Sequence, residues 1–225
     1  MLTRHLSSAS PSIGLADTVA DRLRQQVIDG EFHPGQRLSE AALSQQLDIS
    51  RNTLREVFRI LIKEGLLSHE PNRGVSVVVP TMSDIIDIYR VRRIVECHAL
   101  EKSWPLHPAR KRMQEAVDTA RRLRDAGDWC GVGSANMAFH AAIAALNDSE
   151  RLSAMFADIA AELRLAFGLL DDPEYLHAPY VDDNGRILQL LLDGHGEAAS
   201  RELEAYLLQS ERVILAEYAK QVSQD

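Results

Sequence analysis

The sequence predicts a mainly α-helical protein in which an N-terminal winged helix-turn-helix precedes an all-helical bundle. Two observations support this prediction. Three amphipathic segments and a β-hairpin follow one another over residues 15–80, and the later segments repeat their apolar residues at helical spacing. We therefore divide the chain into a flexible N-terminus at residues 1–14, a winged-helix domain at 15–80 and a helical domain at 81–225.

The composition is that of a globular protein. The chain has 225 residues, of which 45% are hydrophobic and 26% charged, and this length is enough for two domains that each bury a core. The first fourteen residues lack an apolar leader, and no apolar run reaches the length of a membrane span. Cys97 and Cys130 lack the spacing of a metal site or disulfide framework. We expect a cytoplasmic protein.

Helix start and stop signals define the first two helices. Val19, Leu23 and Val27 recur at helical spacing, and the first helix ends at Asp29-Gly30, where glycine accepts a left-handed conformation. Pro34-Gly35 forms a turn, after which Ser39 is a good N-cap for a short second helix.

The third helix, capped by Ser50, separates its side chains into two faces. Its apolar residues lie on one side and its basic residues on another; they are Leu54, Val57, Phe58, Leu61 and Ile62 against Arg51, Arg55, Arg59 and Lys63. Asp48-Ile49 supplies the tight turn before it. Such a helix packs on its neighbours while it presents cations to a partner.

A hairpin and further helices complete the pattern. Residues 66–70 and 75–79 flank the turn Pro71-Asn72-Arg73-Gly74, and Pro80 ends the hairpin. Thr81 to Asp84 forms a capping box, so a helix begins there. We expect further helices at residues 108–126, 131–146, 149–170, 175–192 and 197–220.

The cationic face of the third helix favours duplex DNA as a partner. The net charge of −8 argues against it, but residues 1–80 hold nine basic and nine acidic residues, so the deficit belongs to the helical domain. Arg51 and Arg55 share one helix face, and arginine pairs with the two major-groove acceptors of guanine. Ser50, Asn52 and Thr53 suit phosphate oxygens, and Arg73 in the wing suits the minor groove or a phosphate. The alternative is a merely solvated cationic face.

The segment from Val27 to Gly74 resembles the GntR family of bacterial transcription regulators. The family's SR-x-x-(L/V)-R-E element is present as Ser50 to Glu56, and Pro34-Gly35 and Lys63-Glu64-Gly65-Leu66 also match. The resemblance implies that Arg51 and Arg55 contact operator bases, and that a homodimer binds a pseudo-palindromic operator. Some relatives have an operator-contacting arginine where this chain has Ala41, so that contact is not expected here.

The helical domain resembles the FCD effector domain of the FadR-type subgroup. The resemblance implies a divalent-metal site, and its ligand positions fall on Asn136, His140, Asn184 and Tyr206. Only His140 is a good metal ligand. We therefore expect no bound cofactor, with a divalent metal ion as the lesser alternative.

The same four residues, with Arg92 or Arg93, are our candidates for a pocket that hydrogen-bonds a small-molecule effector, such as an organic acid, directly. The alternative is a buried polar cluster whose hydrogen bonds are satisfied internally. The sequence does not place His177 and Arg164, which are further candidates for this pocket.

These observations favour a DNA-binding transcription regulator, a repressor, whose operator affinity a small molecule controls. One alternative is a regulator without small-molecule input whose helical domain only dimerises. A second is an enzyme with His140 as general base, but no nucleophile–base pair, phosphate loop or paired carboxylates stand at an interpretable spacing. We expect that the protein is not an enzyme.

Overall fold

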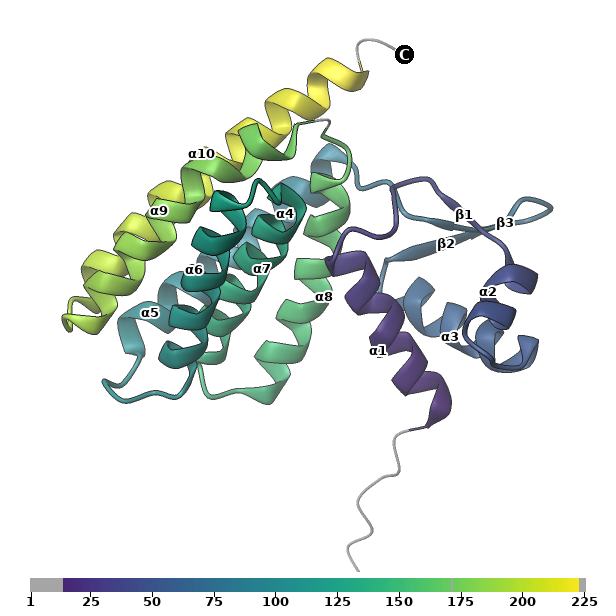
Figure 1. The fold of residues 1–225 in the computed structure, drawn as a ribbon, viewed down its shortest axis with the longest axis horizontal. Coiled ribbons are helices and arrows are strands. Elements are labelled where there is room, and N and C mark those ends of the chain that lie inside the picture. The colour runs from purple at the N-terminus through teal and green to yellow at the C-terminus, as the bar shows by residue number, and fades with distance from the viewer. Residues whose placement is uncertain (1–13, 171, 223–225) are drawn as a thin grey trace, which may run out of the picture.

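The structure is a computed structural model that describes residues 14–170 and 172–222. It confirms the predicted fold class, with a winged helix-turn-helix followed by a helical bundle (Figure 1). The flexible segment expected at residues 1–14 lies, except for Gly14, outside the described residues. The winged helix consists of α1 (Leu15–Ile28), β1 (Arg37–Leu38), α2 (Glu40–Gln46), α3 (Arg51–Lys63), β2 (Leu67–Glu70) and β3 (Gly74–Val77).

The predicted helix boundaries of the winged helix are confirmed at the level of the caps. The hydroxyls of Ser39 and Ser50 accept hydrogen bonds from the main-chain N–H groups of Ala42 and Thr53, at 3.3 and 3.1 Å. Asp48 has a φ of 52°, so the turn between α2 and α3 requires a left-handed residue. These local signals place the starts of α2 and α3 and the turn between them.

The wing is a three-stranded antiparallel sheet in the order β1-β3-β2. The predicted hairpin is present, with Leu67 opposite Val77 and Glu70 opposite Gly74. Strand β1 was not predicted; its two residues pair with β3, so that Leu38 lies opposite Val75. This extra strand ties the segment before α2 to the wing.

The C-terminal half is a bundle of helices. These are α4 (Met82–Arg92), the π-helical turn η1 (Arg93–Cys97), α5 (His98–Lys102), α6 (Ala109–Asp125), α7 (Trp129–Ala145), α8 (Glu150–Phe167), α9 (Pro173–Leu192) and α10 (Gly196–Val222). The predicted capping box at Thr81 and Asp84 is present. Among the described residues, no helix combines the length and apolarity needed to cross a membrane.

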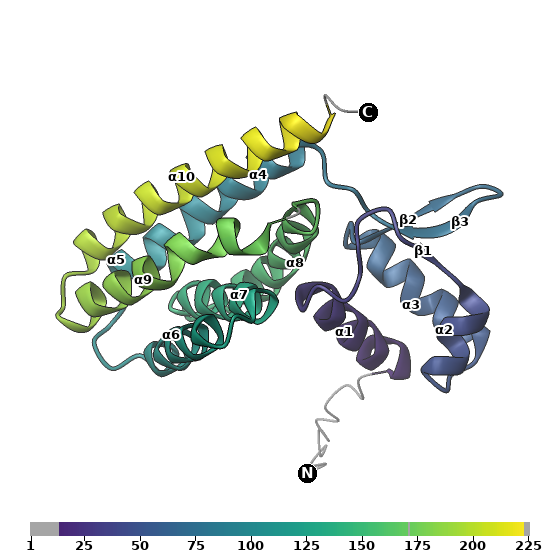
Figure 2. The ribbon, with the colours of Figure 1, turned by 45° about the horizontal axis from the view of Figure 1, so that its top comes forward.

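Helix α8 contributes to the cores of both halves. Phe156 and Leu163 pack in the core of the bundle. Ala161 and Leu165, by contrast, pack in the core of the winged helix, against a set that includes Leu23. Figures 1 and 2 both place α8 beside α1. The winged helix is therefore completed by a helix that comes more than 70 residues later in the chain.

A hydrogen bond reinforces this contact between α8 and α1. The Nε of Arg164 donates to the main-chain carbonyl of Ile28 over 2.9 Å. Gly30, with a φ of +78°, lies so close that an added Cβ would stand 2.7 Å from Arg164 Nη2. The left-handed backbone conformation favours glycine at this turn, and a larger residue would also displace the end of the Arg164 side chain.

Candidate functional site

Helix α3 presents a polar N-terminal face and buries the opposite one. Arg51, Asn52 and Arg55 are exposed, whereas Leu54, Val57, Phe58 and Leu61 are buried in the core of the winged helix. The hydroxyls of Ser50 and Thr53 hydrogen-bond each other at 2.8 Å, at the end of the helix where free main-chain N–H groups attract anions. The predicted DNA-contacting residues of α3 thus lie together on one exposed surface.

The wing places one further predicted DNA-contacting residue at its tip. Arg73 is exposed, and its Nη1 donates to Glu70 Oε2 at 3.0 Å. Asn72 beside it has a φ of 64°, which closes the turn between β2 and β3. Arg73 therefore projects at the end of the hairpin, held by an exposed ion pair that contributes little to stability.

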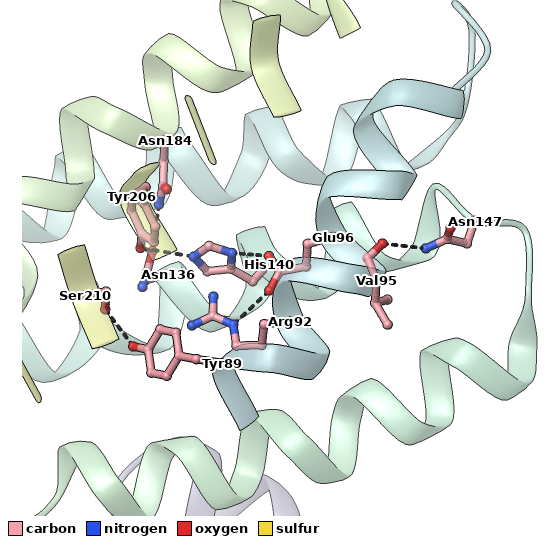
Figure 3. Close-up of polar contacts among 10 residues, drawn as sticks. All are labelled: Tyr89, Arg92, Val95, Glu96, Asn136, His140, Asn147, Asn184, Tyr206 and Ser210. Atoms are coloured by element: carbon pink, nitrogen blue, oxygen red, sulfur yellow. Dashed lines mark hydrogen bonds and ion pairs between the residues drawn. The ribbon is translucent and has the colours of Figure 1, made fainter. Parts of the chain in front are cut away.

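The buried polar residues of the bundle form one cluster that joins α4, η1, α7, α9 and α10 (Figure 3). His140 Nδ1 lies 2.5 Å from Glu96 Oε2, and His140 Nε2 lies 3.0 Å from the hydroxyl of Tyr206. Asn136 Oδ1 accepts from Asn184 Nδ2 at 2.7 Å and lies 3.2 Å from the same Tyr206 hydroxyl. All five residues are buried.

A buried ion pair forms the other end of the cluster. Arg92 Nε donates to Glu96 Oε1 at 2.8 Å, and the Arg92 guanidinium stands 5.1 Å from the centre of the Tyr89 ring. Tyr89 in turn hydrogen-bonds Ser210 at 2.6 Å. Glu96 belongs to the π-helical turn η1, a local widening that is frequent at functional sites.

The charges within the cluster cancel. Burial favours the neutral form of Glu96, but Arg92 and His140 outweigh it and lower the pKa of this carboxyl below its ordinary value. Burial lowers the pKa of His140, and Glu96 offsets this only in part. Burial also raises the pKa of Tyr206 well above its ordinary value. At neutral pH the cluster therefore holds one cation, one anion and neutral hydrogen-bonding groups.

Several hydrogen-bonding groups of the cluster remain unsatisfied. Arg92 Nη2, a donor, and Asn184 Oδ1, an acceptor, are buried without a partner among the described residues. With His140 neutral and its proton on Nδ1 toward Glu96, His140 Nε2 and Asn136 Oδ1 compete for the single proton of Tyr206. Buried groups left unpaired cost about 1–3 kcal/mol each. The effector pocket and the internally satisfied cluster both remain predictions.

The residues present do not fit the metal ion that the fold family implies. The four positions converge, but Asn136 and Asn184 offer neutral amides and Tyr206 keeps its proton. Both ring nitrogens of His140 are engaged, and Glu96 is paired with Arg92. Within residues 14–170 and 172–222, no group of three or more His, Cys, Asp or Glu side chains could hold a metal ion.

The structure brings together five of the six predicted pocket residues. Asn136, His140, Asn184, Tyr206 and Arg92 meet, whereas Arg93 lies outside the cluster. The Nη1 of Arg93 donates to Glu211 on α10 at 2.5 Å. Successive helical residues point about 100° apart, so Arg92 and Arg93 cannot both face the core.

Glu96, Tyr89 and Ser210 were not predicted from the sequence as members of this cluster. The spacing of Arg92 and Glu96, four residues apart on one helix, was the signal that could have identified the ion pair. Arg164 and His177, which the sequence did not place, lie outside the described hydrogen bonds of the cluster. Arg164 faces α1, and the His177 ring packs against Gly133 of α7 and Phe167 of α8.

Two family models match the chain. The model described as bacterial regulatory proteins of the gntR family matches residues 15–77, and the FCD domain model matches residues 87–209. The chain belongs to the GntR family. Its FCD domain is consistent with the predicted FadR-type subgroup. The family consists of transcription regulators and not of enzymes.

Known relatives agree with this assignment. The crystal structure of a GntR regulator from Rhodococcus sp. RHA1 is 43% identical, covers 89% of this GntR-family chain and 97% of its own, and has a TM-score of 0.84. The HTH-type regulator YdhC of Bacillus subtilis is 35% identical over 81 residues, 36% of each chain. The gluconate operon transcriptional repressor of Bacillus licheniformis is 34% identical over 97 residues, 43% of this chain and 38% of its own. The chain spans little more than a third of these two curated relatives.

Proposed function

We propose that this GntR-family regulator is a repressor that binds its operator as a homodimer through α3 and the wing, and that a small molecule bound in the FCD domain controls this binding. The observation that carries the proposal is the exposed N-terminal face of α3, on which Arg51 and Arg55 stand one turn apart. Repression is supported by the gluconate operon repressors among the relatives.

In this proposal Arg51 and Arg55 contact bases in the major groove, while Ser50, Asn52 and Thr53 contact phosphates. Arg73 contacts the minor groove or a phosphate from the wing. One winged helix covers too few base pairs for genomic specificity, so two copies bind half-sites about one helical turn apart. In this proposal the two arginines of α3 supply the base contacts, while the start of α3 and the wing supply the positioning contacts.

The buried cluster is the proposed effector site. Its support is the pair of unsatisfied groups, the donor Arg92 Nη2 and the acceptor Asn184 Oδ1, which a small molecule with one acceptor and one donor would satisfy. An organic acid would have to displace Glu96 from Arg92, because Glu96 already neutralises the guanidinium. Binding would then shift α4 and α10, between which the cluster lies, and thereby the two DNA-binding heads.

A selection experiment tests the DNA-binding part. The full chain is incubated with duplexes of randomised sequence, and the bound fraction is sequenced. We expect a pseudo-palindromic consensus, and Arg51→Ala should weaken binding to it by roughly 1–3 kcal/mol while relaxing the preference at one position. Unchanged affinity and preference in Arg51→Ala would contradict the assignment of α3 as the recognition helix.

A ligand screen tests the effector part. Thermal unfolding is followed in the presence of organic acids and of uncharged hydroxyl or amide compounds, and hits are added to the DNA-binding assay. Asn184→Ala should abolish the thermal shift of a genuine effector, whereas Gln189→Ala, which removes an exposed amide of the same helix, should not. If no compound changes operator affinity, the alternative of a domain that only dimerises replaces this part of the proposal.

A further inference from the structure

An ion pair links α2 to the exposed face of α3. The Nε of Arg55 donates to Glu40 Oε2 at 3.0 Å, and the two side chains come from different helices of the helix-turn-helix. Arg51 and Arg59, which share the cationic side of α3, form no hydrogen bond or ion pair with any residue that the structure describes. Arg55 is therefore restrained in a way that these two arginines are not.

Stability does not account for this pair. The side chains of Arg55 and Glu40 are 57% and 36% exposed, and exposed ion pairs contribute about 0–1 kcal/mol. The position of Glu40 is well defined, however, because it is the first residue of α2 and follows the N-cap Ser39. The carboxylate that pairs with Arg55 is thus anchored at the first residue of the neighbouring helix.

We propose that Glu40 is a positioning residue for DNA recognition, which holds the Arg55 guanidinium so that Nη1 and Nη2 face a guanine. This inference rests on the proposed base contact of Arg55. Because Glu40 occupies Nε, the two terminal nitrogens remain free as a planar fork, which matches the O6 and N7 acceptors of guanine. Fixing the side chain before binding also reduces the conformational entropy that binding would otherwise cost.

The surroundings of the pair explain why such a restraint is useful. Glu40, Arg55 and Arg59 line a groove of about 550 Å³ between α3 and the wing, together with His69 of β2. A groove with this excess of basic groups attracts any phosphate of the DNA backbone. An unrestrained Arg55 would therefore pair with backbone phosphates in duplexes of any base sequence. By engaging Arg55, Glu40 favours base recognition over indiscriminate phosphate binding.

The test compares base preference with general affinity in the full-length protein. Glu40→Ala, Glu40→Gln and Arg55→Ala are each selected against duplexes randomised at their centre, and affinities are then measured for the wild-type consensus and for random-sequence duplex. Glu70→Ala is the matched control, because it removes one carboxylate from an ion pair with Arg73 in the same domain. Thermal unfolding verifies that each variant is folded.

We expect Glu40→Ala to lower the preference at the base pair read by Arg55 roughly tenfold, with affinity for random duplex unchanged or raised. Glu40→Gln, which keeps an acceptor for Nε, should retain part of the preference. Glu70→Ala should leave the preference at that base pair intact. In the Arg55→Ala background, Glu40→Ala should have no further effect at this position, because its action passes through Arg55.

Three results would overturn the proposal, and they separate it from the proposed function. If Arg55→Ala loses the preference but Glu40→Ala keeps it, the base contact stands and the positioning role fails. If Glu40→Ala acts equally in the Arg55→Ala background, or no more specifically than Glu70→Ala, Glu40 acts independently of Arg55. If Arg55→Ala itself changes no preference, the base contact of Arg55 fails as well.

Discussion

Arg164 in α8 donates a hydrogen bond from its Nε to the main-chain carbonyl of Ile28, the last residue of α1. The last carbonyls of a helix have no partner within the helix, so this one is satisfied from the other half of the protein. Together with Ala161 and Leu165, which pack in the winged-helix core, Arg164 makes α8 the structural link between the bundle and the DNA-binding head.

Arg164→Ala should weaken this link. We expect the free energy of unfolding to fall by about 1–3 kcal/mol, because the Ile28 carbonyl loses a donor close to the domain junction. Denaturant unfolding measures the loss, and hydrogen exchange should rise at the end of α1. Arg186→Ala, which removes an exposed arginine of α9, is the control and should change neither quantity. Equal exchange in wild type and Arg164→Ala would show that the hydrogen bond does not couple the halves.

Two leucines of α8 should report on different cores. Leu165 and Leu163 are each 1% exposed, but Leu165 packs in the winged helix and Leu163 in the bundle. Each change to alanine should cost about 2–5 kcal/mol. Hydrogen exchange should increase mainly in α1 and α3 for Leu165→Ala, and mainly in the bundle for Leu163→Ala. The same pattern in both variants would mean that the two cores unfold as one unit.

The features that the sequence predicted correctly are local ones. Ser39, Ser50 and Thr81 each accept a hydrogen bond from a main-chain N–H three residues later, and Asp48 forms a turn through its left-handed backbone conformation. A short stretch of sequence is therefore enough to predict each of these features. The two residues of β1 were missed because their pairing with β3 spans almost 40 residues. The π-helical turn was missed because its wider hydrogen-bonding pattern leaves no periodic signal.

The candidate sites show the same contrast between features set by nearby residues and features that depend on distant ones. The two faces of α3 could be predicted because helical spacing alone separates them. The convergence of Asn136, His140, Asn184 and Tyr206 came from a family resemblance, because three different helices contribute these residues and helical spacing does not relate them. Glu96 was missed, since its importance depends on His140 lying 2.5 Å away across the bundle. The pairing of Glu40 with Arg55 likewise depends on the angle between α2 and α3.

The stability of the protein should fall on acidification because of His177. This side chain is 2% exposed and its Nε2 has no partner among the described residues, and burial, together with nearby Arg164, lowers its pKa from 6.5 to about 3. Between these two values the unfolded chain binds a proton at His177 and the folded chain does not. The free energy of unfolding should therefore decrease by about 1.4 kcal/mol for each pH unit below 6.5 from this group.

Replacing His177 by glutamine should reduce the slope with which the free energy of unfolding falls below pH 6.5. Denaturant unfolding at a series of pH values from neutral to acidic measures the slope, and the variant is compared with His195→Gln, which removes an exposed histidine. The His195→Gln slope should equal that of the wild type. An unchanged slope in His177→Gln would show that His177 titrates normally in the folded protein.

Metal binding should be absent from the natural protein and recoverable by three substitutions. Tyr206 hydrogen-bonds both His140 and Asn136, and Asn136 accepts from Asn184, so the four positions of a metal site converge while the donor types do not suit a metal ion. The variant Asn136→Asp, Asn184→His, Tyr206→His provides one carboxylate and three imidazoles, a good ligand set for Zn²⁺.

Calorimetric titration with zinc chloride should show one site per chain in this variant. Zinc should also raise its unfolding temperature, because a bound ion stabilises the folded state. Adding His140→Ala to the variant should remove most of this binding. Equally tight zinc binding by the wild-type chain would contradict the conclusion that its residues do not fit a metal ion.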